Sequence, residues 1–251
     1  MKTTSPLNNN INTAVILAAG RGERIAGGEE YRSKPLIKLY DLSLIERSIK
    51  KLSNKLKVNK IYVITGFKHD ELKIHLDKLK RKLTVDLEVV FAKEWEKGNG
   101  ASFLSVLNHI KQKQFYLLMV DHIFNDEFYS TISKSKINNT KCYLTISKSL
   151  SSMHDYNDAT KVKIVENKIT NIGKSISEAD GFDTGFFVLH SEAFNDVKNL
   201  SEKKFLALSD VMQLLIQEQK LYFIEVTADS WLDIDTKIDF SNAKDFLLNF
   251  S

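Results

Sequence analysis

Hydrophobic residues in the first half of the chain gather in short runs, and each run is followed by a longer segment with helical spacing. The runs are AVILAA (14–19), KIYVITGF (60–67), DLEVVFA (86–92) and FYLLMV (115–120). They lack the polar alternation of strands that have one face in water, so we expect strands buried on both faces. Strands alternating with helices predict a parallel sheet covered by helices.

The segment 43–56 (SLIERSIKKLSNKL) predicts the first of these helices. Its start, Ser43-x-x-Glu46, is typical of a capping box. The same apolar spacing recurs over 70–83 and 100–112. The apolar stripe of the first helix consists of Leu44, Ile45, Ile49, Leu52 and Leu56.

After about residue 140 the strands follow one another at shorter intervals. The expected strands are KCYLTIS (141–147), TKVKIVENKITNIG (160–173), DTGFFVL (183–189) and LYFIEV (221–226). The second of them indicates a hairpin that turns at residues 166–168 and forms an insertion or a second sheet edge. The C-terminal segment 237–250 predicts a closing helix. We therefore expect one α/β domain over residues 12–251, with a mostly parallel central sheet and a small β-rich insertion, after a flexible tail over residues 1–11.

Composition narrows the classes of partner. The 251 residues are 43% hydrophobic, enough for a sizeable core, and the net charge of +4 gives only a mild preference for anionic ligands. No block of basic residues is interleaved with aromatic ones, which argues against nucleic acid as a partner. Cys142 is the single cysteine, so an intrachain disulfide and a cysteine-based zinc cluster are excluded, and a reducing cytoplasm fits.

The N-terminus, MKTTSPLNNNINT, is polar and lacks the apolar core of a secretory signal. Later windows fall short of the roughly 18 continuous apolar residues of a membrane span. We therefore expect a protein without a membrane domain, and its oligomeric state stays open.

The loop that follows the first predicted strand carries the strongest chemical pattern, VILAAGRGERIAGGEEYRSKPLIKL (15–39). In open parallel sheets, ligands bind beyond the carboxyl ends of the strands. Glycines let the backbone approach a ligand, and Arg21, Arg24 and Lys34 can neutralise a polyphosphate. The simpler alternative is a tight turn with solvated cations. The loop has neither the Gly-Lys-Ser/Thr of a Walker loop nor the third glycine of a dinucleotide-binding loop.

LAAGRGERI (17–25) followed by SKPLIKL (33–39) resembles the signature of the sugar-phosphate nucleotidyltransferase superfamily. The resemblance implies a Rossmann-like (GT-A-like) nucleotidyltransferase fold. It also implies that Arg24 and Lys34 are catalytic cations and that Arg21 is a further phosphate contact. The backbone of the loop would lie against the base and phosphates through Leu17, Ala18, Ala19, Gly20, Arg21 and Gly22.

The resemblance requires metal-binding carboxylates. YLLMVDHIF (116–124) ends its apolar run at Asp121, and WLDIDTKIDF (231–240) places Asp233 and Asp235 on one face if extended. Asp121, also expected to be catalytic, and Asp235 can hold Mg²⁺ through oxygen, with Asp233 as a supporting or alternative ligand. The simpler alternatives are that Asp121 starts a turn and that Asp233 is a helix cap or a surface charge.

Four further stretches resemble more specifically the cytidylyltransferase domain that makes CDP-inositol from inositol 1-phosphate, a family often fused to a membrane CDP-alcohol transferase. They are EKGNGAS (96–102), VDHIF (120–124), IGKSISEADGFDTGFFVL (172–189) and WLDIDTKID (231–239). With the opening loop, the resemblance extends from about residue 13 to residue 245. The valine before Asp121 and the acidic Glu29 and Glu30 in the loop depart from the superfamily pattern, and Arg32 has no assigned role.

The resemblance also implies which residues bind the base and the acceptor. The start of the predicted helix near residue 100 would hold the edge of a pyrimidine through Lys97, Gly98, Asn99, Gly100 and Ser102. The acceptor's hydroxyl and phosphoryl groups would be bound by Asp183, Thr184, Lys161, Lys163 and Lys174. Lysines in a hairpin are also common as solvated charges on a sheet edge.

We expect an Mg-dependent cytidylyltransferase that moves CMP from CTP to a small phosphorylated alcohol, with inositol 1-phosphate favoured. Other acceptors stay open, namely 2-hydroxyethyl- or 2-aminoethylphosphonate, and a sugar-1-phosphate nucleotidyltransferase is a further alternative. A regulatory subunit that binds nucleotide without catalysis is the non-enzymatic alternative. Any lipid-linked or di-inositol product is expected to be made by another protein.

Overall fold

A sheet of nine strands forms the centre of the computed structural model, which describes residues 11–26, 33–151, 155–195, 197 and 203–249. The strands are β1 (Thr13–Ala18), β2 (Lys38–Leu39), β3 (Leu42–Ser43), β4 (Lys60–Thr65), β5 (Asp86–Phe91), β6 (Gln114–Met119), β7 (His122–Phe124), β8 (Cys142–Ser147), β9 (Lys161–Val165), β10 (Lys168–Gly173), β11 (Gly181–His190), β12 (Leu221–Glu225) and β13 (Trp231–Asp233). The helices are α1 (Glu23–Ala26), α2 (Leu44–Leu56), α3 (His69–Lys80), α4 (Asn99–Leu104), α5 (Asp126–Lys134), α6 (Leu208–Gln217) and α7 (Lys237–Asn249).

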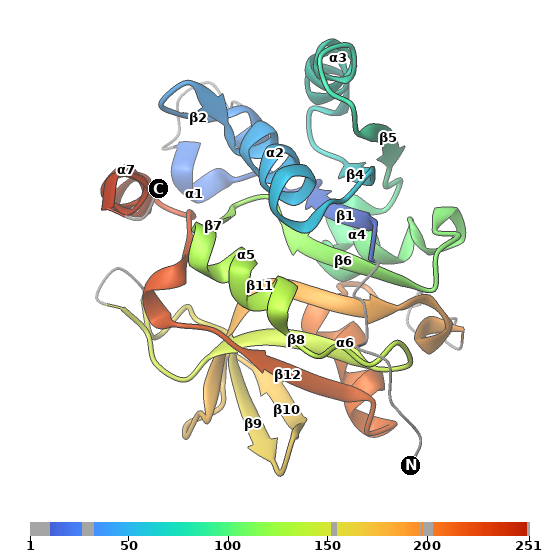
Figure 1. Ribbon diagram of the computed structural model, residues 1–251, viewed down its shortest axis with the longest axis vertical. Helices are drawn as coiled ribbons and strands as arrows, with labels where there is room; N and C mark the ends of the chain where they lie inside the picture. Colours follow the sequence, from blue (N-terminus) through green and yellow to red (C-terminus); the bar gives the residue numbers. More distant parts are fainter. Residues whose placement is uncertain (1–10, 27–32, 152–154, 196, 198–202, 250–251) are drawn as a thin grey trace.

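The strand order of the large sheet is β5-β4-β1-β6-β11-β8-β12-β10-β9 (Figure 1). The first four strands pair in parallel, which confirms the α/β expectation for the first half. The second half is mixed, because β11 enters between β6 and β8 and runs antiparallel to both. The carboxyl ends of β1, β4, β5 and β6 therefore meet at one edge, where open α/β sheets place their ligands.

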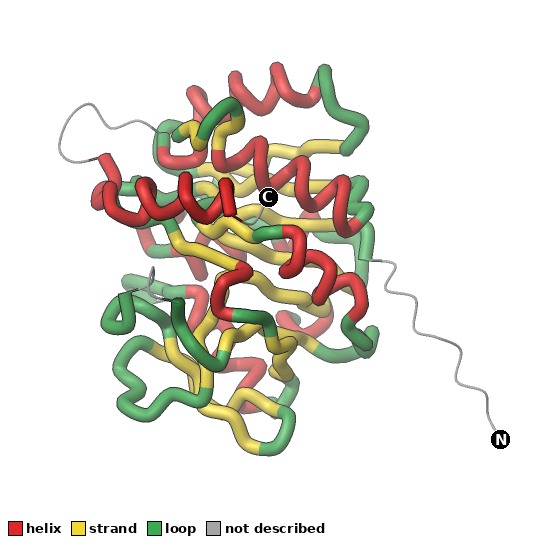
Figure 2. Tube along the Cα trace, turned by 60° about the vertical axis from the view of Figure 1, so that its left-hand side comes forward, coloured by secondary structure: helices red, strands yellow, loops and turns green. Residues whose placement is uncertain are grey.

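Both faces of the sheet are buried, as the continuous apolar runs predict. In β1, Ala14 and Ile16 belong to one cluster of buried side chains, and Val15 and Leu17 belong to the other. Figure 2 shows helices on both sides of the strands. Buried residues of α2, α3, α5 and α7 join the first cluster, and those of α4 and α6 join the second.

Local signals in the sequence placed several elements correctly. The capping box forms at α2, where Ser43 Oγ accepts a hydrogen bond from the Glu46 backbone at 3.3 Å. The predicted hairpin forms as β9 and β10, turns at Glu166 with φ of 55°, and lies at the edge of the large sheet. The helix expected over 100–112 is shorter, since α4 ends at Leu104 and the Ser105 hydroxyl bonds the Ser102 carbonyl at 2.6 Å.

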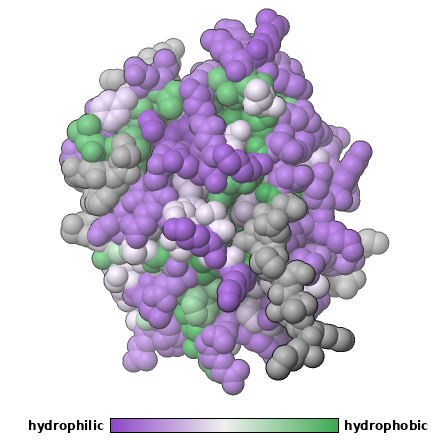
Figure 3. All heavy atoms as spheres, in the orientation of Figure 1, coloured by the Kyte–Doolittle hydropathy of each residue, from purple (hydrophilic) through white to green (hydrophobic). Residues whose placement is uncertain are grey.

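The surface in Figure 3 is mostly hydrophilic, with small apolar areas between charged side chains. Among the residues described, the helices are all too short or too polar to cross a membrane. Residues 1–10 of the expected tail lie outside the described residues, and Ile11 is already buried in the core.

Candidate active site

The loop between β1 and β2 brings Lys34 into the interior. Lys34 begins a short 3₁₀ helix with Pro35, and its side chain is 7% exposed. Gly22 passes directly over the aliphatic stem of Lys34, with φ of 67°, and a Cβ atom there would lie 2.6 Å from Lys34 Cβ. Gly22 therefore serves close packing of the loop. Glu29, Glu30 and Arg32 lie outside the described residues.

The Lys34 ammonium group lies between two carboxylates from distant parts of the chain. Its Nζ atom is 2.7 Å from Asp121 Oδ2 and 2.5 Å from Asp235 Oδ1. Burial alone would lower the pKa of Lys34, but Asp121 and Asp235 outweigh it and the pKa is raised. Burial would likewise raise the pKa of Asp121, yet Lys34 and His122 hold it well below the ordinary value. Lys34 and Asp121 are therefore both charged at neutral pH.

Arg24, in α1, extends the same cluster. Its guanidinium group bonds both Asp235 and Asp158. Asp235 is fixed in turn by α7, because Asp239 Oδ2 accepts hydrogen bonds from the backbone of Asp235 at 3.0 Å and of Thr236 at 2.7 Å. The two predicted catalytic cations thus meet the predicted carboxylates at one point.

His122 and Asp233 form a second group of ionisable side chains that adjoins Asp121. The short strands β7 and β13 pair so that His122 is opposite Asp233. His122 Nδ1 is 3.0 Å from Asp121 Oδ1 and 3.8 Å from Asp233 Oδ1, and its ring stacks on Trp231 at 6.1 Å between centroids. Burial raises the pKa of Asp233 to about 7. Burial alone would lower the pKa of His122, but the nearby carboxylates of Asp233 and Asp121 have the larger effect and raise it to about 9.

This second group has the composition of a cation site. The ligand atoms of Asp121, His122 and Asp233 lie within 4.8 Å of one another. Asp233 Oδ1 is buried and has no hydrogen-bond partner in the described part of the chain. A buried carboxylate oxygen without a partner is costly unless a cation or water approaches it. Asp233, which the sequence indicated as a supporting or alternative ligand, therefore lies beside the predicted ligand Asp121.

Two adjoining cavities meet at this cluster. One, of about 670 Å³, lies beside the opening loop and is lined by Leu17, Ala19, Gly20, Arg21, Gly22, Lys34, Trp95, Glu96, Gly98, Asn99, Ser102 and others. The other, of about 610 Å³, is lined by Asp155, Asp158, Lys174, Asp183, Ser209, Trp231, Asp233 and others. Arg24, Asp121 and Asp235 border both, as do Asn99, Met119 and Phe205. We refer to them below as the loop cavity and the acidic cavity.

The predicted base-binding segment forms one wall of the loop cavity. Gly98 has φ of 112°, and a Cβ atom there would lie 2.5 Å from the Leu206 carbonyl. Asn99 Oδ1 accepts a hydrogen bond from the backbone of Leu208 at 2.7 Å, so its carbonyl oxygen holds the start of α6. The Lys97 ammonium group pairs with Glu94. Ala18 and Gly100 are buried in β1 and α4, and neither of them lines the loop cavity or the acidic cavity.

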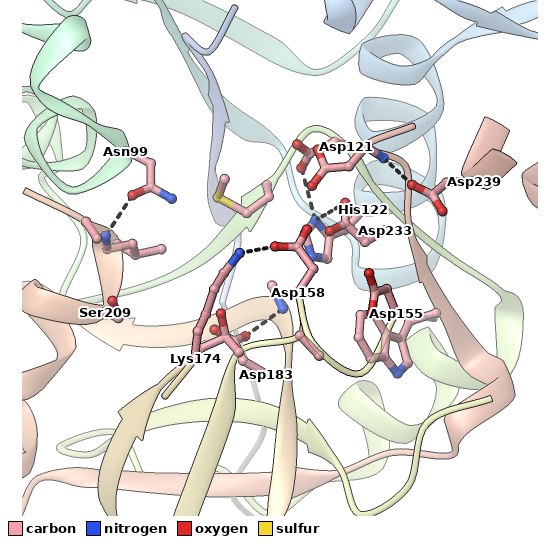
Figure 4. Close-up of a pocket in the computed structure, with 18 of the residues that line it drawn as sticks. Asn99, Asp121, His122, Asp155, Asp158, Lys174, Asp183, Ser209, Asp233 and Asp239 are labelled. Carbon is pink, nitrogen blue, oxygen red and sulfur yellow. Dashed lines mark hydrogen bonds and ion pairs between the residues drawn. The ribbon is translucent and has the colours of Figure 1, made fainter. Parts of the chain in front are cut away.

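The predicted acceptor residues separate into two groups. Lys174 and Asp183 line the acidic cavity, and Lys174 pairs there with Asp158. Figure 4 shows this pair facing the cluster of Asp121, His122 and Asp233, with Asn99 on the opposite side. The other three predicted residues bond elsewhere: the Thr184 hydroxyl bonds Thr145, the Lys161 ammonium bonds backbone carbonyls of Ala159 and Lys174, and Lys163 pairs with Asp180.

Several side chains at the site were not predicted from the sequence. Asp158 contacts Arg24 across 134 positions in the chain, and it stands in a polar loop where a carboxylate is unremarkable. Trp95 and Glu96 line the loop cavity from the turn before α4. Only Glu96 belonged to a matched stretch, as the first residue of EKGNGAS.

Gly185 packs directly against the imidazole ring of His122. Its φ is 73°, and a Cβ atom there would lie 2.5 Å from His122 Cδ2. We expect Gly185→Ala to displace the imidazole ring and to lower stability by about 1–3 kcal/mol. Thermal melting checks this, with Gly173→Ala as the control, because a Cβ atom on Gly173 would lie more than 4 Å from every described residue except its two chain neighbours. Equal melting temperatures for the two variants would contradict it.

The fold and the cation-lined loop beyond β1 define a nucleotidyltransferase. Residues 14–145 match the family model described as a MobA-like NTP transferase domain, and the chain belongs to this family.

Among curated relatives, the chain is 33% identical over 242 residues to a bifunctional IPC transferase and DIPP synthase of Aquifex aeolicus, covering 95% of this chain and 52% of the relative. It is 29% identical over 236 residues to the protein of the same name from Archaeoglobus fulgidus, covering 94% and 44%. The chain therefore spans about half the length of these relatives. Among solved structures, the inositol-1-phosphate CTP transferase from T. maritima superposes with a TM-score of 0.82 at 24% identity, covering 96% of both chains, which shows a common fold.

Proposed function

We propose that the protein transfers CMP from CTP to inositol 1-phosphate, releasing pyrophosphate and forming CDP-inositol. The observation that carries this proposal is the junction of the two cavities at Arg24, Asp121 and Asp235. A donor nucleotide in the loop cavity and an acceptor in the acidic cavity would meet there. The names of the similar proteins, which include an IPC transferase and an inositol-1-phosphate CTP transferase, support this choice of substrates.

The residues at the junction suit an in-line displacement at phosphorus. An oxygen of the acceptor phosphate attacks the α-phosphorus of CTP, a new P–O bond forms, and the bond to the departing pyrophosphate breaks. The acceptor phosphate is already ionised near neutral pH, so no general base is needed. Arg24 borders both cavities and Lys34 borders the loop cavity, so these cations neutralise charge on the transferring and leaving phosphates.

The carboxylates also fit a divalent cation such as Mg²⁺. Asp233 Oδ1, which accepts no hydrogen bond within the described part of the chain, offers an oxygen ligand of the kind that hard cations prefer, together with the carboxylates of Asp121 and Asp235. Asp121 and Asp235 would hold the ion, with Asp233 beside them. When bound, the ion supplies charge neutralisation for phosphate oxygens and aligns them.

The acidic cavity suits an acceptor that carries several hydroxyl groups. Asp155, Asp158 and Asp183 line it, and ionised carboxylates are hydrogen-bond acceptors for which a cyclic polyol has many donors. Burial raises the pKa of Asp183 to about 6, which still leaves it mostly ionised at neutral pH. Lys174, which pairs with Asp158, lines this cavity together with Arg24 and would bind the acceptor's phosphoryl group.

A pyrophosphate-release assay tests the function directly. Each of the four common nucleoside triphosphates is crossed with inositol 1-phosphate, choline phosphate, sugar 1-phosphates and small phosphonates, in the presence of Mg²⁺. We expect the fastest release with CTP and inositol 1-phosphate. Faster release with CTP and a phosphonate, or with another triphosphate and a sugar 1-phosphate, would replace our proposal with that alternative. No release with any pair would favour a regulatory nucleotide-binding subunit.

A further inference from the structure

Arg21 and Glu96 form an ion pair at the loop cavity to which the proposed mechanism assigns no role. Arg21 Nη2 lies 2.6 Å from Glu96 Oε1, and both residues line the cavity. They approach from different walls, since Arg21 follows β1 and Glu96 belongs to the turn that precedes α4. The pair therefore lies where the opening loop faces the segment that begins α4.

Aromatic rings hold the guanidinium group of Arg21 in place. Its Cζ atom lies 5.0 Å from the centroid of the Trp95 ring and 5.5 Å from that of Phe67. Trp95 is itself packed tightly, because a Cβ atom on Gly66 would lie 2.4 Å from its ring. Cation–π contacts of this kind favour one position of the guanidinium plane. Arg21 is thus held against Glu96, the residue just before the segment predicted to bind the base.

The two side chains differ in what they offer a nucleobase. An ionised glutamate only accepts hydrogen bonds, and an arginine only donates them. Their mutual bond uses Oε1 of Glu96 and Nη2 of Arg21, which leaves the Oε2 atom and the Nη1 group as a neighbouring acceptor and donor. The pair therefore presents an acceptor beside a donor.

Cytosine has the complementary edge. Its N4 amino group donates, and the adjacent N3 and O2 atoms accept, whereas uracil has an accepting O4 atom beside a donating N3–H group. A uracil in the same position would place O4 against the carboxylate and N3–H against the guanidinium. Both contacts would be repulsive, so the pair would discriminate twice between two bases of nearly equal size.

We propose that Glu96 and Arg21 select cytosine, with Glu96 accepting from the N4 amino group and Arg21 donating to the ring acceptors. This inference rests on the proposed function, because it takes CTP as the donor. It assigns Arg21 to the base, whereas the sequence pattern alone indicated a phosphate contact.

The test compares Glu96→Gln with Glu94→Gln in the pyrophosphate assay, with CTP and with UTP. The two glutamates are two positions apart, both are exposed, and each pairs with a cation, but only Glu96 lines the loop cavity. A glutamine amide can donate to O4 as well as accept from N4. We expect Glu96→Gln to lower the ratio of kcat/KM for CTP over UTP by at least about tenfold, the size of one lost base contact. Glu94→Gln should leave the ratio unchanged.

Three outcomes separate the inference from the function on which it rests. An unchanged ratio in Glu96→Gln, with wild-type protein still preferring CTP, would overturn the selection by Glu96 and leave the proposed function standing. An equal fall of this ratio in both variants would show that it depends on the overall charge of the region and not on Glu96, and would also overturn the inference. If the wild-type protein prefers another triphosphate, the proposed function and this inference both fail. Matched thermal melting of the variants shows that each is folded.

Discussion

Lys34→Ala is expected to reduce turnover by at least about a hundredfold and to destabilise the protein by about 3 kcal/mol. The first effect follows from our proposal that Lys34 is the cation next to the transferring phosphates. The second follows because Lys34 is buried between Asp121 and Asp235, at 2.7 and 2.5 Å. Without it, two carboxylates face each other in the interior, and breaking a buried pair by removing one partner is strongly destabilising.

Steady-state kinetics and chemical denaturation measure the two effects separately. Lys51→Ala is the matched control, since Lys51 also pairs with a carboxylate, Asp126, but both side chains are more exposed than those of Lys34 and Asp121, and a pair open to solvent contributes about 1 kcal/mol or less. The double variant Lys34→Ala/Asp235→Asn should recover part of the lost stability, because it removes one of the two opposed charges. Normal turnover in a folded Lys34→Ala variant would exclude a catalytic role.

The approach of Asp121 to the loop that carries Arg24 and Lys34 could be predicted, because this loop and Asp121 each follow a buried apolar run. The roles of Arg24, Lys34 and Asp235 came instead from the resemblance to nucleotidyltransferases. In parallel strands the carboxyl ends share one edge, so residues beyond Leu17 and beyond Met119 must approach each other. The continuous apolar runs themselves identify strands buried on both faces. The start of a helix could also be predicted where the sequence contains a capping motif, as it does at Ser43.

Side-chain direction within a matched motif could not be predicted in the same way. Asp183 and Thr184 are adjacent in β11, so they point to opposite faces, and only Asp183 lines the acidic cavity. Choosing between them requires the register of β11, which shifts between Asp183 and Phe187 where it pairs with β8. The same difficulty arises at the turn before α4. Lys97, which was predicted to bind the base, pairs with Glu94, whereas its neighbour Glu96 lines the loop cavity.

Contacts made by loops were the hardest to predict. Asp158 joins Arg24 and Lys174 although its sequence neighbourhood carries no apolar pattern. Asp158 lies in the loop before β9 and pairs with Lys174, which follows β10. Its position therefore depends on the packing of the β9–β10 hairpin at the edge of the sheet, which involves residues far apart in the sequence. A carboxylate in a polar loop is most often solvated, so sequence alone favours the wrong environment for this residue.

Asp121→Asn is expected to lower turnover at saturating Mg²⁺ by at least about a hundredfold. It should also move the rise in melting temperature that we expect Mg²⁺ to give the wild-type protein without substrate to much higher Mg²⁺ concentrations. Asp121 contacts Lys34 and His122 and borders both cavities, so the neutral amide removes charge from the proposed cation site and leaves Lys34 with one carboxylate partner fewer. Asp126→Asn is the control, because Asp126 pairs with Lys51 and Lys55 on the surface.

The melting experiment distinguishes a ligand from a residue that only orients Lys34. A bound ion stabilises the folded state by an amount that grows with the logarithm of one plus the ratio of its concentration to the dissociation constant, so titration with Mg²⁺ gives an affinity independent of catalysis. If Asp121 is a ligand, the variant should require a much higher Mg²⁺ concentration for the same shift, while Asp126→Asn follows the wild-type curve. An unchanged Mg²⁺ curve in a variant that has lost turnover would reject Asp121 as a ligand and leave it the role of holding Lys34.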